Sequence, residues 1–184
     1  MWTDDQLPPR SEFLTIGEGS EWETVVVDVR RYTRWSTPSG TPVVSPPRLV
    51  VWHHTVGPVT DGPPESVVDR MYAEAKSAQY GLPYNFLVNG GANPTIYYLN
   101  DVDQAWPHTY GHNGDAVAIC AAGNWESQEP PDALVDAMWR ISHALMVMWG
   151  EVLPIVGHRE TYATACPGRH LFARLTALRT DGTT

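Results

Sequence analysis

The stretch Leu49-Val50-Val51-Trp52-His53-His54-Thr55 places four consecutive apolar residues directly before two histidines. An unbroken apolar run of this kind predicts a strand from Arg48 to His53 that is buried on both faces, as in the centre of a layered α/β sheet. Successive side chains of a strand point to opposite faces, so His53 and His54 are not expected to bind one metal ion together. The strand pattern alone does not choose between them.

A second stretch, Gly157-His158-Arg159-Glu160-Thr161-Tyr162-Ala163-Thr164-Ala165-Cys166-Pro167-Gly168, carries two further metal-ligand types. His158 and Cys166 are good partial ligands for zinc, and a catalytic zinc site needs about three protein ligands with one position left open. The histidine pair that ends the first strand is the obvious source of the third ligand, with His53 as the first candidate. Two histidines and one cysteine would leave a tetrahedral corner free, which indicates a catalytic site.

Strand and helix patterns surround these two stretches. A β-branched run predicts a strand at 24–29. A Gly-rich loop between two short apolar runs predicts a hairpin, and apolar residues at helical spacing after each of two Pro-Pro pairs predict two helices. The fold class that follows is α/β, with a mixed central β-sheet flanked by helices in a single domain. We predict further strands at 84–89, 95–99, 115–122 and 154–156, and helices at 64–78, from Asp132 to Gly150, and from Pro167 onward.

The charge and hydropathy of the chain exclude two classes of partner. The 184 residues carry a formal net charge of −9, which disfavours a nucleic-acid partner because such binding uses clustered Lys and Arg. No apolar run approaches the roughly 20 residues of a membrane span, so we expect no membrane insertion. The acidic start of the chain lacks the pattern of a signal peptide, so we expect synthesis in the cytoplasm, and we expect a monomer.

The chain has two cysteines, Cys120 and Cys166, which are too few for a disulfide scaffold. A single bridge between them is the alternative to a metal-binding role. Cys120 lies in the apolar run 116–122, where an unpaired cysteine behaves as a small buried hydrophobic residue. We therefore expect Cys166 to be free to act as a ligand.

Four motifs in order resemble a known family, the zinc N-acetylmuramoyl-L-alanine amidases, which are related to phage amidase endolysins and to peptidoglycan recognition proteins. The resemblance covers roughly residues 48–170 and is far more specific than any one short match. The matching motifs are Val51-Trp52-His53-His54-Thr55, Tyr84-Asn85-Phe86, His108-Thr109-Tyr110-Gly111-His112-Asn113, and Gly157-His158-Arg159-Glu160 leading to Thr164-Ala165-Cys166-Pro167-Gly168.

The resemblance implies a role for each matching residue. It implies a recognition-protein/amidase-like domain over residues 46–184, with zinc bound by His53 and not His54. Metal-bound imidazoles usually donate their other N–H to a carboxylate or carbonyl, so we expect Glu160 to hydrogen-bond around the ligands or to pair with Arg159, and not to act as general base. The full assignment is His53, His158 and Cys166 for zinc, Tyr84 and Thr164 for catalysis, and His54 and His108 for substrate binding.

The activity implied by the resemblance is hydrolysis of the amide between N-acetylmuramic acid and L-alanine of bacterial peptidoglycan by zinc-activated water. A phage endolysin, made in the host cytoplasm and acting on the cell wall, is the leading interpretation, and a non-catalytic peptidoglycan-binding module is the alternative. Recognition proteins without activity typically lack the zinc cysteine, so Cys166 favours an enzyme.

Residues 1–45 lie outside the resemblance. Trp22, Val25, Val26 and Val27 can bury apolar surface, and a strand of this composition rarely stands alone in water. We therefore expect residues 1–45 to form an N-terminal extension packed on the core of the domain.

Overall fold

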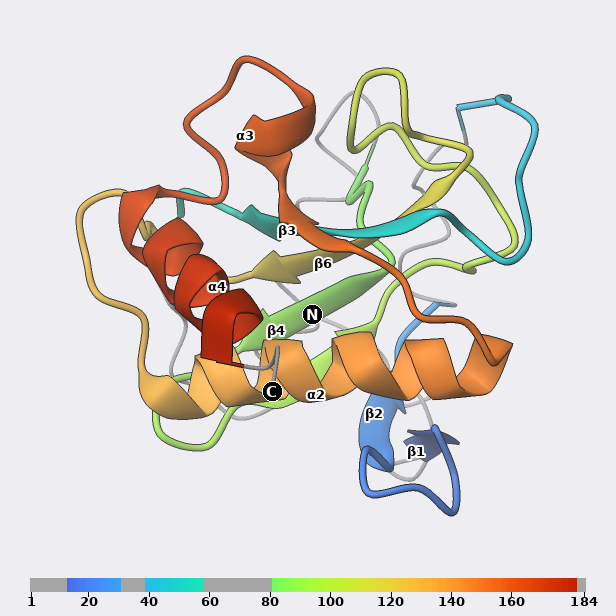
Figure 1. Cartoon of the computed structure of the whole chain (residues 1–184), viewed down its shortest axis with the longest axis horizontal. Helices are drawn as coiled ribbons and strands as arrows, with labels where there is room; N and C mark the ends of the chain where they lie inside the picture. The colour runs from blue at the N-terminus through green and yellow to red at the C-terminus, as the bar shows by residue number, and fades with distance from the viewer. Residues whose placement is uncertain (1–12, 31–38, 58–80, 182–184) are drawn as a thin grey trace, which may run out of the picture.

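The computed structural model describes residues 13–30, 39–57 and 81–181, and in this part of the chain a seven-stranded mixed sheet forms the centre of the molecule (Figure 1). The strand order is β1-β2-β5-β4-β6-β3-β7, which confirms the predicted fold class. The elements are β1 (Phe13–Ile16), β2 (Thr24–Asp28), β3 (Leu49–His54), β4 (Phe86–Asn89), β5 (Thr95–Tyr98), β6 (Ala116–Ala121), α2 (Asp132–Trp149), β7 (Ile155–Gly157), α3 (His158–Thr161) and α4 (Arg169–Asp181).

The parallel half of the sheet contains β4, β6, β3 and β7. β3 lies between β6 and β7 and is almost wholly buried, as its apolar run predicted. The antiparallel pair of β4 and β5 confirms the predicted hairpin, and Gly90 in its loop takes a φ of 116° that a side chain would disfavour.

An N-terminal hairpin of β1 and β2 extends the sheet on the side opposite β7, where β2 pairs in parallel with β5. The backbone N–H of Val29 donates to the carbonyl of Tyr98 and prolongs this pairing. Ile16 and Val26 join the same apolar cluster as the central strands. The strand predicted at 24–29 is confirmed, whereas the division of the chain at residue 45 stays a prediction.

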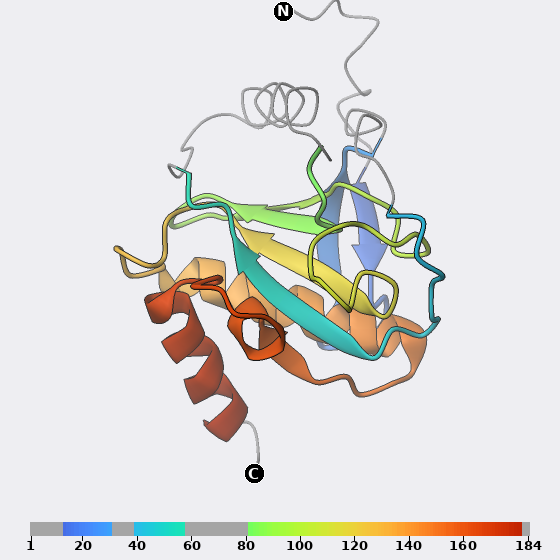
Figure 2. The same ribbon diagram turned by 90° about the horizontal axis from the view of Figure 1, so that it is seen from above.

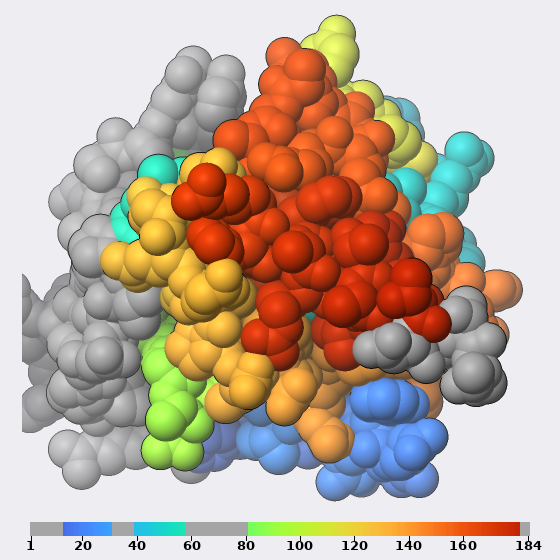
Figure 3. Space-filling model, turned by 60° about the vertical axis from the view of Figure 1, so that its left-hand side comes forward, coloured from blue at the N-terminus to red at the C-terminus, as the bar shows by residue number. Residues whose placement is uncertain are grey.

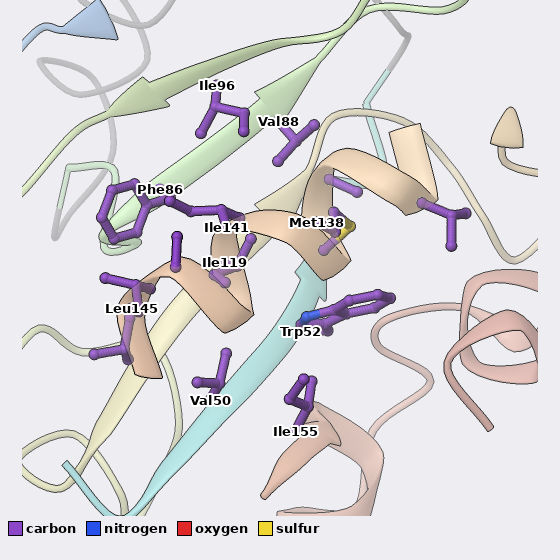
Figure 4. Packing of buried hydrophobic residues seen from close by; sticks show 14 of the residues in the cluster. Val50, Trp52, Phe86, Val88, Ile96, Ile119, Met138, Ile141, Leu145 and Ile155 are labelled. Carbon is purple, nitrogen blue, oxygen red and sulfur yellow. The ribbon is translucent and has the colours of Figure 1, made fainter. Parts of the chain in front are cut away.

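The long helix α2 covers one face of the sheet and buries the main apolar cluster (Figures 2 and 4). It begins after Pro131 and ends at Gly150, whose left-handed φ of 67° lets its N–H reach the carbonyls of Met146 and Val147. Met138, Ile141 and Leu145 point from α2 towards the strands, with Trp52 and Ile119 facing them (Figure 4). The Trp52 indole N–H donates to Ser142 Oγ at 3.0 Å, so this buried polar group is paired.

The opposite face of the sheet carries a smaller buried cluster that includes Leu87, Tyr97, Leu99 and Cys120. The predicted helix at 64–78 lies outside the described residues. In the described part of the chain, no helix is both long and apolar enough to cross a membrane.

The carboxyl ends of the parallel strands place the functional residues. β3, β6 and β7 run in one direction, so the histidine pair of β3 and the start of α3 after β7 reach the same edge of the sheet (Figure 1). In open α/β sheets, ligands bind outside the carboxyl ends of the strands. The carboxyl ends of β3 and β7 are therefore where the fold would hold a ligand.

Candidate metal centre

His53, His158 and Cys166 meet at the edge of the sheet formed by the ends of β3 and β7. One ligand atom from each of the three lies within 4.8 Å of the others. Nδ1 of His53 and Sγ of Cys166 are 3.6 Å apart. Zinc bonds of about 2.0 Å to nitrogen and 2.3 Å to sulfur at tetrahedral angles would set these atoms about 3.5 Å apart. The His53–Cys166 distance therefore suits zinc, and His158 lies near enough to both to complete a group that could hold a metal ion.

The ring of His53 is held in one orientation. Its side chain is 1% exposed, and Nε2 lies 3.3 Å from Oγ1 of Thr109, which leaves Nδ1 facing Cys166. Metal-binding histidines usually donate their other N–H to an oxygen acceptor, which fixes the tautomer and the ring. Thr109 fills that role for His53.

His158 has a buried ring nitrogen that a metal ion could bind. Its Nε2 is buried and has no hydrogen-bond partner among the described residues. A buried imidazole nitrogen without a partner is costly, since most such atoms are paired in folded proteins. A metal ion between His158, His53 and Cys166 would satisfy it.

Burial controls the protonation of all three groups. It lowers the pKa of His53 well below its ordinary value, helped by the neighbouring His108 and His158, and it lowers the pKa of His158. Burial raises the pKa of the Cys166 thiol to about 11. The backbone N–H of His54 and the charge of Arg159 lower this pKa, but by less than burial raises it. The metal-free site thus holds neutral imidazoles and a protonated thiol, and a metal ion would have to displace the thiol proton.

The loop that carries Cys166 is fastened to α3. The backbone N–H of Arg159 donates to the carbonyl of Cys166 at 2.8 Å, and its guanidinium donates to the carbonyl of Ala165 at 2.7 Å. The N–H of Cys166 donates to Thr164 Oγ1 at 3.2 Å. Cys166 and His158 are therefore positioned as one unit.

Glu160 pairs with other groups than Arg159, so the ion-pair alternative for Glu160 was wrong. Its carboxylate accepts the N–H of Gly157 at 2.7 Å and contacts the Arg179 guanidinium at 3.1 Å. Adjacent residues on a helix point in different directions, so Glu160 reaches back to the start of α3 while Arg159 turns to the Cys166 loop. Glu160 thereby orders the first turn after β7.

Two glycines allow the close packing around this unit. A Cβ on Gly157 would lie 2.8 Å from the Phe172 ring, and one on Gly168 would lie 2.4 Å from the backbone of Trp125. Gly168 also has a φ of 92°, which favours glycine. A larger residue at either position would push α4 or the 166–168 loop away from the sheet.

Tyr84 and His108 lie beside the cluster. The ring centroids of Tyr84 and His53 are 5.2 Å apart, and those of His108 and His53 are 5.5 Å apart. Burial lowers the pKa of His108 to about 3, so its ring is neutral. Its Nδ1 lies 2.8 Å from Oγ1 of Thr109, whereas Nε2 is buried without a hydrogen-bond partner in the described chain.

Thr164 and His54 lie at the edge of this arrangement. Thr164 Oγ1 is engaged by the Cys166 backbone, as described above. His54 follows His53 on β3 and accepts the N–H of Trp125 at Nδ1, 3.3 Å away, and burial lowers its pKa. His54 lies outside the group of three ligands. The catalytic role of Thr164 and the substrate-binding role of His54 stay predictions.

Thr109 is the contact that the sequence reasoning missed. Its hydroxyl lies between Nε2 of His53 and Nδ1 of His108 and is 1% exposed. The signal was its place directly after His108 in the third motif, together with the rule that a metal-bound histidine needs an acceptor.

The structure has no disulfide between Cys120 and Cys166. Cys120 is fully buried in β6, as expected, and Cys166 is partly exposed. The thiol of Cys166 is therefore available to the cluster.

Residues 43–169 match the model of a family described as N-acetylmuramoyl-L-alanine amidase. The chain belongs to this family. It is 32% identical over 136 residues to a peptidoglycan-recognition protein of Drosophila simulans, a match covering 71% of this chain and 73% of the relative. It is 28% identical over 132 residues to a human N-acetylmuramoyl-L-alanine amidase, covering 65% of this chain and 22% of that protein.

Solved structures of the same fold agree with the family. An Apis mellifera recognition protein, PGRP-SA, superposes with a TM-score of 0.71 at 18% identity, covering 82% of this chain and 94% of that one. An endolysin amidase, LysCS, from Clostridium intestinale gives a TM-score of 0.55 at 23% identity, covering 71% and 84%. These likenesses establish the recognition-protein/amidase fold for this member of the family.

Proposed function

We propose that this family member is a zinc-dependent amidase that hydrolyses the bond between N-acetylmuramic acid and L-alanine in bacterial peptidoglycan. The observation that carries the proposal is the convergence of His53, His158 and Cys166 in a geometry that suits zinc. Three protein ligands leave a fourth position for water or substrate, as catalytic zinc sites do.

Zinc, when bound, polarises the amide carbonyl and lowers the pKa of its water towards about 7. The chain's own residues prepare the site for that chemistry. Burial keeps His53 and His158 neutral, so both imidazoles have a lone pair to offer. The 166–168 loop, tied to α3, holds the Cys166 thiol towards Nδ1 of His53.

Tyr84 and His108 supply hydrogen-bonding groups beside the ligands. Each ring lies within 5.5 Å of the His53 ring, centroid to centroid. If Nδ1 of His53 binds the metal, its Nε2 carries the hydrogen and donates to Thr109, whose hydroxyl can then donate to Nδ1 of His108. The Nε2 of His108 is left as a neutral donor for a substrate carbonyl. In this proposal, the Tyr84 hydroxyl hydrogen-bonds the attacking water or the developing oxyanion.

A non-catalytic peptidoglycan-binding protein is the second candidate, favoured by the names of the insect relatives. A phage endolysin acting on the wall of its host is the finer form of the first candidate. The retained ligand set, with Cys166 free, supports the enzyme over the binding protein.

Digestion of purified peptidoglycan tests the proposal. We expect new alanine amino groups to appear without new reducing sugar ends, to stop with a chelator and to return when zinc is added. A metal-free chain with full activity would refute the role of zinc. Wall binding without any product, in the zinc-loaded chain, would establish the binding protein instead.

A further inference from the structure

Two exposed tyrosines, Tyr110 and Tyr162, meet at the rim of the metal centre. Tyr110 is 80% exposed and Tyr162 is 50% exposed, yet their ring centroids lie 5.8 Å apart at an angle of 50°. They come from segments 52 positions apart in the chain: the turns before β6 and the end of α3. In Figure 3 the yellow-green segment before β6 lies against the orange segment after β7 at one end of the molecule.

The pair is continuous with the site. The Tyr162 ring stacks on the His158 ring, with centroids 6.1 Å apart and an angle of 25°, and the His158 ring lies 4.6 Å from that of His53. Aromatic surface therefore runs without a break from solvent to the ligands. In the described chain, Phe13 is the one other large aromatic side chain that is exposed, and it belongs to the far edge of the sheet.

Backbone hydrogen bonds anchor the chain at or next to both tyrosines. The N–H of Tyr162 donates to the carbonyl of His158 and ends α3, with extended backbone at Tyr162 itself. Thr109 lies directly before Tyr110, and its backbone N–H donates to Asn113 Oδ1. Its hydroxyl is within hydrogen-bonding distance of His53 and His108. Two exposed rings set on anchored turns lose little conformational entropy when a ligand packs on them.

We propose that Tyr110 and Tyr162 form a stacking subsite for a pyranose ring of the glycan strand. This inference rests on the proposed function, which places the lactyl carbonyl of N-acetylmuramic acid at the ligands. A single lactyl unit separates that carbonyl from the sugar ring, so the ring falls next to the site. Pyranose rings present an apolar C–H face that packs on aromatic rings. The L-alanine on the other side of the amide bond offers no such face.

Binding of peptide-free disaccharide tests the subsite without requiring catalysis. The probe is N-acetylglucosaminyl-N-acetylmuramic acid, which contains no scissile amide, titrated into the zinc-loaded full chain and followed by NMR. We expect Tyr162→Ala or Tyr110→Ala to weaken binding roughly fivefold to tenfold, as the loss of one aromatic contact does. Tyr162→Phe keeps the ring and should bind within about twofold of the native chain.

The controls separate the two proposals. Val152→Ala changes a 92% exposed apolar side chain remote from the ligands and should leave disaccharide binding unchanged. Stem peptide alone should bind equally to native and tyrosine variants. Equal disaccharide affinity in all variants, no disaccharide binding to the native chain, or loss of peptide binding alone would each overturn the subsite. The two proposals can also fail separately. If the native chain forms no amidase product but the tyrosine variants lose disaccharide binding, the subsite stands and only the proposed function is refuted.

Discussion

The Trp52–Ser142 pair under α2 and the histidines of the metal centre are all buried, but their polar atoms are paired to different degrees. Under α2, the Trp52 indole donates to Ser142, and the Ser142 hydroxyl donates to the carbonyl of Met138. At the metal centre, Nε2 of His108 and Nε2 of His158 have no hydrogen-bond partner among the described residues. An unpaired buried donor or acceptor costs about 1–3 kcal/mol. The pairing is not complete under α2, since the indole N–H of Trp125 in the same cluster also has no partner in the described chain. The two unpaired histidine nitrogens differ in that they lie among or beside the three metal-ligand side chains, where a ligand can reach them.

Loss of one metal ligand should have the largest effect. We expect Cys166→Ser to abolish zinc binding and to lower amidase activity by more than the 10- to 100-fold typical for residues behind the ligands. Cys120→Ser is the matched control, because Cys120 is fully buried and lies outside the group of three ligands. It should keep its zinc and lose stability only, by about 1 kcal/mol or more. Elemental analysis of both variants measures this, and equal metal loss would contradict the assignment.

Removal of residues 1–45 should damage the apolar region and spare the metal centre. Ile16, Val26 and Val29 are buried, and each such side chain is worth roughly 1.5–3 kcal/mol. We expect the free energy of unfolding to fall by about 3 kcal/mol or more, with zinc content unchanged because all ligands lie beyond residue 50. An unchanged thermal melt with weakened wall binding would instead make this segment a docking arm.

Zinc affinity should depend on pH through Cys166. The thiol has a pKa of about 11 in the metal-free site, and the pKa values of His53 and His158 are lowered from 6.5. Between pH 7 and 9, binding therefore displaces one thiol proton and none from the histidines. Affinity should rise about tenfold per pH unit, or about a hundredfold over that window. Competition with a chromophoric chelator measures the slope, which should vanish in Cys166→Ala.

Thr109→Val removes the hydroxyl between His53 and His108 while keeping the side-chain volume. We expect zinc affinity to fall about 10-fold or more, because His53 loses the acceptor that fixes its tautomer. Thr109→Ser retains the hydroxyl and should restore most of the affinity. Native affinity in Thr109→Val would show that the 3.3 Å contact does not orient His53.

The smallest effect is expected under α2. Ser142→Ala leaves the Trp52 indole N–H buried without its acceptor and should lower the free energy of unfolding by about 1–2 kcal/mol. Zinc content should not change, since Ser142 lies outside the ligand group. Urea denaturation measures the loss. A loss below about 0.5 kcal/mol would mean that pairing matters less in this interior than the comparison implies.

Local patterns in the sequence were sufficient for the central strand, the β4–β5 hairpin and α2. The apolar run of β3 and the Pro131 and Gly150 ends of α2 are signals contained within a few residues. The grouping of His53, His158 and Cys166 was predicted from the ligand types and the four motifs, and the structure brings them together.

Contacts between distant side chains were beyond that reasoning. The hydroxyl of Thr109 reaches His53 across 56 positions, and Glu160 pairs with Arg179 across 19. Such pairs depend on how α4 and the loop before β6 pack on the sheet, and no local period encodes them. The parallel pairing of β2 with β5 is of the same kind, because strand order is a property of the whole sheet.

The position of β3 between β6 and β7 also sets when the site can form. Nδ1 of His53 and Sγ of Cys166 are separated by 113 positions along the chain, and His53 reaches its place only when β3 has found both later strands. Contacts of such long sequence separation form slowly, because a large loop must close before they contribute. During synthesis, the ligand group therefore assembles only after almost the whole domain has left the ribosome. The ligand group therefore forms late in folding, together with the sheet that carries it.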